Sequence, residues 1–189
     1  MRDEPYQPDQ IGAYGATEQP AIAARMTPHL RLTMAGAICS LLGVLTAIGA
    51  LATFPAFSAN DTGSGWAVVA LVTAVAMFAV CVIQVLVWRR AMASWRGVRI
   101  QDLHGEARLS WIAHLVSYAI VLVALWACIA GSVEAGLTAT AAVLLAITLL
   151  FIIGGQVLAG VQYLRPAGPP GTLPAHMRRL IELNKRRND

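Results

Sequence analysis

The chain has 189 residues, of which 57% are hydrophobic and only 13% are charged, and its formal net charge is +4. Soluble domains carry about 25% charged residues, so this composition excludes a water-soluble globular domain. The mean hydropathy of +0.62 indicates an integral membrane protein instead.

The first 31 residues are a polar segment that contains four Pro, four acidic residues and three Arg. The segment has no apolar stripe at helical spacing, and too little apolar surface to offset the entropy of ordering the chain. We therefore expect residues 1–31 to be a Pro/Gln-rich cytoplasmic tail that becomes ordered only against a partner.

Four tracts without Asp, Glu, Lys or Arg follow this tail, at residues 32–54, 66–88, 110–131 and 137–163. About 20 helical residues span the roughly 30 Å hydrocarbon core of a bilayer, so each tract is long enough to cross it. The sequence thus predicts an all-α fold, an integral membrane four-helix bundle over residues 32–163, and leaves no room for a separate folded domain.

The basic residues divide unequally between the two sides of this bundle. Of the 14 Lys and Arg residues, 3 precede residue 32, 5 lie in the central loop 89–109, and 6 follow residue 164. Because cytoplasmic loops are enriched in basic residues, both termini and the central loop are predicted to be cytoplasmic. The rings near the predicted boundaries are expected to anchor the bundle at headgroup depth: Trp66, Trp88, Trp111, Trp126 and Tyr163.

Two cytoplasmic segments carry the basic residues that we expect to contact anionic phospholipid or a partner protein. In the central loop these are Arg89, Arg90, Arg96 and Arg99. Residues 164–189 begin with a Pro/Gly linker and continue into a predicted amphipathic helix, whose basic residues are Arg178, Arg179, Lys185, Arg186 and Arg187. Membrane insertion itself requires such a charge distribution, so the basic pI does not indicate nucleic-acid binding.

Small residues recur at four-residue spacing within the spans and let helix backbones approach closely. The candidates for helix packing are Gly36, Ser40 and Gly43 on the first span and Gly155 and Ala159 on the fourth. They can face each other inside the bundle or face another protein. Two amides within the spans, Gln84 and Gln156, can hydrogen-bond to neighbouring helices.

The spans lack the residues on which membrane chemistry usually depends. Transport sites usually hold an ionisable group at membrane depth, and no acidic or basic residue occurs there. His114 is the only His within a span, and Cys39, Cys81 and Cys128 form no Cys-x-x-Cys pair. We therefore predict neither an enzyme nor a haem, metal or other cofactor site.

The four-span layout, the Ala- and Arg-rich composition and the Pro/Gln-rich tail from Pro5 to Pro20 resemble the small accessory subunits of actinobacterial respiratory assemblies, which flank the cytochrome bcc complex and its terminal oxidase. The resemblance implies a non-catalytic subunit of a larger complex in the bacterial plasma membrane, with other membrane subunits as partners. It assigns no functional residue.

Two alternatives belong to other functional classes. A free-standing small transporter or channel needs polar groups that converge at one depth, and Gln84, His114 and Gln156 are the residues near enough in depth to do so. A homo-oligomeric membrane regulator needs a self-complementary face of small residues.

Overall fold

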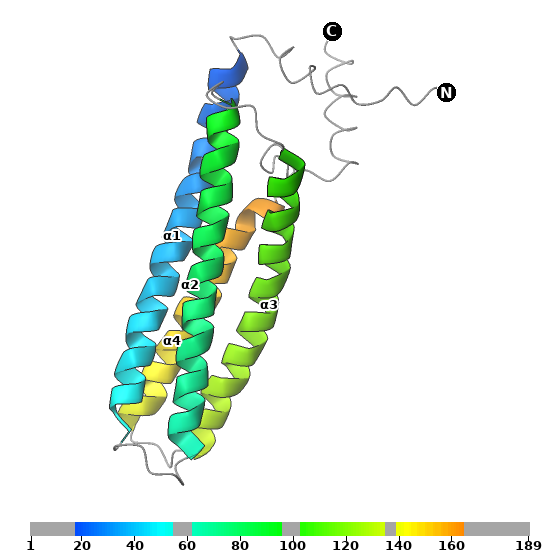
Figure 1. Ribbon diagram of the computed structural model, residues 1–189. Helices are drawn as coiled ribbons and strands as arrows, with labels where there is room; N and C mark the ends of the chain where they lie inside the picture. Colours follow the sequence, from blue (N-terminus) through cyan, green and yellow to red (C-terminus); the bar gives the residue numbers. More distant parts are fainter. Residues whose placement is uncertain (1–17, 55–61, 96–102, 135–138, 165–189) are drawn as a thin grey trace.

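The computed structural model describes residues 18–54, 62–95, 103–134 and 139–164, which form four long helices (Figure 1). These are α1 (Glu18–Ala52), α2 (Thr62–Trp95), α3 (Leu103–Glu134) and α4 (Ala139–Leu164). Each contains a stretch long and apolar enough to cross a membrane: Thr27–Ala52, Ser64–Arg90, Arg108–Val133 and Thr140–Val161. The predicted all-α membrane bundle with four spans is confirmed.

Three helices extend beyond the predicted spans at the same end of the bundle, and one of them is α3, which begins at Leu103 rather than at residue 110. Residues 18–31, which composition assigns to the N-terminal tail, belong to α1, and Pro28 lies within this helix. The helix α2 continues past Trp88 to Trp95. Proline has no backbone N–H to donate, so at Pro28 the helix continues without one of its hydrogen bonds.

Neighbouring helices run antiparallel, as the short connections require (Figure 1). The helix α1 packs closely on α4 and α2, and α2 also packs on α3, while α3 and α4 contact each other over a smaller area. Among the described residues α1 and α3 do not touch, so these two helices occupy opposite corners of the bundle.

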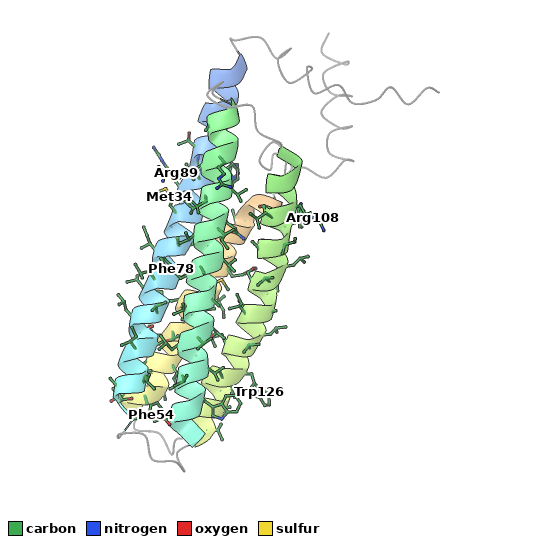
Figure 2. All side chains as sticks on the ribbon, viewed as in Figure 1. Met34, Phe54, Phe78, Arg89, Arg108 and Trp126 are labelled. Atoms are coloured by element: carbon green, nitrogen blue, oxygen red, sulfur yellow. The ribbon has the colours of Figure 1, made fainter. Side chains whose placement is uncertain are left out.

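The surface of the bundle is apolar on all four helices, as contact with lipid requires (Figure 2). The most exposed large side chains include Ile38 on α1, Val72 on α2, Leu122 on α3 and Leu150 on α4. The interior is built mainly from small residues and a few large ones, among them Met77 and Ile152 in one buried cluster and Leu145 in another. Dispersion between closely spaced helices holds such an interior together, because lipid offers no hydrophobic driving force.

The basic residues of α1, α2 and α3 lie toward one end of the bundle, which we call the basic end. It comprises the start of α1, the end of α2, the start of α3 and the end of α4. Arg89 and Arg108 lie toward it in Figure 2, whereas Phe54 and Trp126 lie toward the opposite end.

Candidate functional site

The predicted packing residues of the first and fourth spans face each other inside the bundle. A Cβ atom placed on Gly36 of α1 lies 2.9 Å from the Gly155 carbonyl oxygen and 3.1 Å from the Ala159 amide nitrogen of α4. Gly36, Gly155 and Ala159 are all buried. The groove of small residues on α4 is thus filled by α1 of the same chain.

Hydrogen bonds and thiol contacts continue this contact toward the opposite end. The Ser40 hydroxyl donates to the Gly36 carbonyl at 2.9 Å and lies 3.4 Å from the Cys81 sulfur of α2. Further along, the Thr46 and Thr148 hydroxyls are 2.9 Å apart, and Thr46 donates to the Gly43 carbonyl. The contact between α1 and α4 therefore combines close backbone packing at glycines with contacts between small polar side chains.

The structure describes part of the predicted basic surface. Arg89 and Arg90 are exposed at the end of the α2 span, and Arg31 and Arg108 are exposed on the neighbouring helices at the same end. The other predicted contacts lie outside the described residues: Arg96, Arg99, Arg178, Arg179, Lys185, Arg186 and Arg187. The predicted C-terminal amphipathic helix also lies outside them.

Buried polar side chains concentrate toward the basic end, where three helices contribute to what we call the polar interior. Its buried members are His29 and Thr33 on α1, Gln84 on α2, and Ser110, His114 and Ser117 on α3. The Thr33 hydroxyl donates to the His29 carbonyl at 3.0 Å, and Ser117 donates to the His114 carbonyl at 2.6 Å. These two hydroxyls therefore form hydrogen bonds within their own helices. The larger polar side chains, those of His29, Gln84 and His114, project into the bundle.

Trp88 belongs to this polar interior, and its prediction as a headgroup anchor is wrong. The side chain is 1% exposed and stacks on His29 of α1, with ring centroids 5.6 Å apart and an interplanar angle of 6°. Composition predicts that His29 belongs to the N-terminal tail, yet it lies on α1 and is buried. Trp126, by contrast, is exposed near the opposite end, as an anchor should be (Figure 2).

Gln84 Oε1 and Trp88 Nε1 have no hydrogen-bond partner among the described residues. They are an acceptor and a donor on the same face of α2. Both side chains are 1% exposed, so bulk solvent does not reach them. Leaving such groups unpaired costs about 1–3 kcal/mol each.

His114 of α3 connects the polar interior to α4 and to the lipid-facing surface. A Cβ atom placed on Gly160 of α4 lies 3.0 Å from His114 Cε1 and 3.6 Å from Gln156 Nε2, so both side chains pack against this glycine. On the other side, the His114 ring meets Tyr118 edge to face at a centroid distance of 4.9 Å and Trp111 at 6.1 Å.

The antiparallel register places Gln84 at the depth of His114. Trp66 of α2 packs against Gly131 of α3, where a Cβ atom on the glycine lies 3.1 Å from the Trp66 Cβ. Gln84 is 18 residues after Trp66, and Ala113 is 18 residues before Gly131, so Gln84 lies level with Ala113 and His114. The structure thus brings Gln84, His114 and Gln156 to one end of the bundle, in the depth range that the sequence suggested.

Within the described residues, no group of three or more His, Cys, Asp and Glu side chains is arranged to hold a metal ion. The three cysteines are free thiols, with Cys81 and Cys128 buried and Cys39 partly buried. The Cys39 sulfur lies 3.6 Å from the Phe151 carbonyl oxygen, across the contact between α1 and α4.

No protein-family model, curated protein or solved structure matches this chain. These comparisons identify no family, and what the structure shows is a four-helix membrane protein.

Proposed function

We propose that this protein is a non-catalytic accessory subunit of a larger bacterial membrane complex, and that the complex is a respiratory-chain assembly. One observation carries the first part of the proposal: an unpaired phenol on the lipid-facing surface at membrane depth. The resemblance in layout and composition to respiratory accessory subunits supports the second part.

The phenol belongs to Tyr118, whose side chain is 50% exposed on α3. Tyr118 follows Arg108 by 10 residues, which is about 15 Å along a helix and about half of the hydrocarbon thickness. Among the described residues its contact is the edge-to-face packing on His114, and its hydroxyl has no hydrogen-bond partner. Because lipid tails offer no acceptor, a polar group of a neighbouring protein is the favoured partner for this hydroxyl.

The residues around Tyr118 form a continuous face that a transmembrane helix can cover. We call it the α3 face, and it consists of the exposed side chains Trp111, Leu115, Tyr118, Leu122 and Trp126. Steps of three and four residues place them on one side of the helix. Large aromatic side chains are enriched at protein interfaces, so this face suits another membrane subunit.

The structure gives less support to the two alternatives. A transporter or channel needs a polar route through the bundle, but the polar interior gathers at the basic end, and apolar side chains such as Met77, Ile152 and Leu145 fill much of the remaining core. A homo-oligomeric regulator needs a free face of small residues. Gly36 and Gly155 are instead buried against each other within one chain.

Photo-crosslinking at Tyr118 tests the proposal in native membranes. We expect a photoreactive phenylalanine analogue at Tyr118 to give a stable adduct with a different membrane protein, because the α3 face lies against that subunit. Mass spectrometry of the adduct identifies the partner. Respiratory subunits in the adduct support the full proposal, whereas other membrane subunits support only the accessory role.

The matched control carries the same analogue at Val157 of α4, which lies level with Tyr118 and is 49% exposed. Adducts at both positions with the same range of proteins indicate random collisions and contradict a specific interface. An adduct with the mass of two copies of this chain supports the homo-oligomer, and no protein adduct at Tyr118 contradicts the proposal.

The proposed location is the bacterial plasma membrane, with both termini in the cytoplasm. All basic residues of the four helices lie toward one end of the bundle, which supports this orientation. In intact cells a membrane-impermeant thiol reagent should label Ser58→Cys, between α1 and α2, and leave Ser94→Cys unlabelled until the cells are lysed. The reverse pattern contradicts the orientation.

A further inference from the structure

The polar interior contains a donor and an acceptor that are placed to share one small ligand. Gln84 and Trp88 are four residues apart on α2, so their side chains leave the helix on the same face, with Cβ atoms about 5–6 Å apart. Gln84 Oε1 accepts hydrogen bonds and Trp88 Nε1 donates one, and neither atom has a partner among the described residues. Both side chains are 99% covered, which limits any occupant to a very small molecule.

We propose that the polar interior of the basic end is a hydrated site, in which an ordered water molecule bridges Gln84 and Trp88. The water donates one hydrogen bond to Gln84 Oε1 and accepts one from the Trp88 N–H. Buried waters typically make about three hydrogen bonds to polar groups that the protein alone leaves unsatisfied. His114 lies at the depth of Gln84 and Ser117 is one turn further along α3, so the surroundings are polar.

The hydration ends where the apolar core begins. Cys81 lies one turn before Gln84 on α2, and its sulfur faces the Ser40 hydroxyl and the Gly155 carbonyl at the tight contact of α1 with α4. One turn beyond, Met77 is fully buried in a cluster of Ala, Cys and Ile side chains. Such surroundings offer water few partners, so the hydrated site does not extend past Cys81 toward the opposite end of the bundle.

Radiolytic hydroxyl labelling in ¹⁸O-water tests the site in the full chain reconstituted in lipid nanodiscs. Radicals formed from bound water oxidise the side chains beside it, and mass spectrometry locates the incorporated oxygen. We expect labelling of Trp88 despite its burial, and no labelling of the equally buried Met77, although its thioether oxidises readily. Labelling of neither residue, or of both to the same extent, overturns the proposal.

The variant Gln84→Leu removes the acceptor and should abolish labelling of Trp88, because an apolar side chain of similar size no longer holds the water. Its thermal unfolding is measured in parallel to show that the bundle still folds. Unchanged labelling of Trp88 in a folded Gln84→Leu protein overturns the bridge.

Ultraviolet resonance Raman spectroscopy of the unlabelled protein gives an independent readout. The indole N–H band of Trp88, isolated as the difference between the unmodified protein and Trp88→Phe, should lie at the hydrogen-bonded position in nanodiscs and after delipidation in detergent. A band at the position of a free N–H overturns the proposal. A hydrogen-bonded band that disappears on delipidation assigns the site to a lipid headgroup and overturns the proposal of water as the occupant.

Discussion

Replacing Trp88 with Ala should lower the free energy of unfolding of the bundle by about 3–5 kcal/mol, the range for truncation of a buried aromatic side chain. The indole is almost fully buried and stacks on His29, so its removal leaves a cavity between α1 and α2 and exposes the face of the imidazole ring. Reversible unfolding in mixed micelles, followed by circular dichroism, measures the loss.

The matched control is Trp126→Ala on α3. That side chain is 64% exposed, and in micelles of the isolated chain it faces detergent in the folded bundle and in the separated helices alike, so the expected change is within about 0.5 kcal/mol. Equal losses for the two variants, or a larger loss for Trp126→Ala, contradict the inward placement of Trp88.

The second large effect is expected for Gly36→Ala, at about 1–3 kcal/mol of destabilisation. The added methyl group lies 2.9 Å from the Gly155 carbonyl oxygen and 3.1 Å from the Ala159 amide nitrogen. Both atoms belong to the backbone of α4, which cannot rotate away as a flexible side chain can. The helices must separate, and they lose dispersion contacts along the whole α1–α4 interface.

Gly49→Ala on the same helix is the control for this variant. A Cβ atom at Gly49 meets only the end of the Leu144 side chain, at an ordinary contact distance of 3.8 Å. Ala is the better helix former by up to about 1 kcal/mol, so Gly49→Ala should be neutral or stabilising in the same unfolding experiment. If Gly36→Ala behaves as Gly49→Ala does, the close approach of α1 and α4 at Gly36 is wrong.

The candidate site was predictable from sequence only in part. Gln84, His114 and Gln156 attract attention because polar side chains are costly in hydrocarbon and therefore face the interior. Trp88 follows Gln84 by four residues, so the same reasoning places it on the interior face. That signal was present, but the position of Trp88 at a span boundary favours an anchor when each residue is considered by itself.

The start of α1 shows a second reason why the sequence predicts only part of the candidate site. Composition assigns His29 to a tail because residues 1–31 are rich in Pro and polar side chains. In the bundle α1 begins at Glu18, and Trp88 of α2 supplies the surface on which His29 stacks. An isolated segment cannot reveal contacts that stabilise it from another helix.

The number of helices, the apolar stretch of each one that can cross a membrane, and the gathering of basic residues at one end all follow from the sequence. A bilayer forces every spanning segment to satisfy its own backbone hydrogen bonds, so a long apolar tract has few alternatives to a helix. The rotation of each helix about its own axis becomes evident only in the packed bundle. Both sides of these helices are apolar, because lipid and protein interior are alike in polarity, so no hydrophobic pattern specifies which face turns inward. Packing geometry fixes these rotations. Because Gly36 has no side chain, α1 approaches α4 closely and buries Gly155. The rotations of α2 and α3 bury Trp88 and leave Tyr118 exposed.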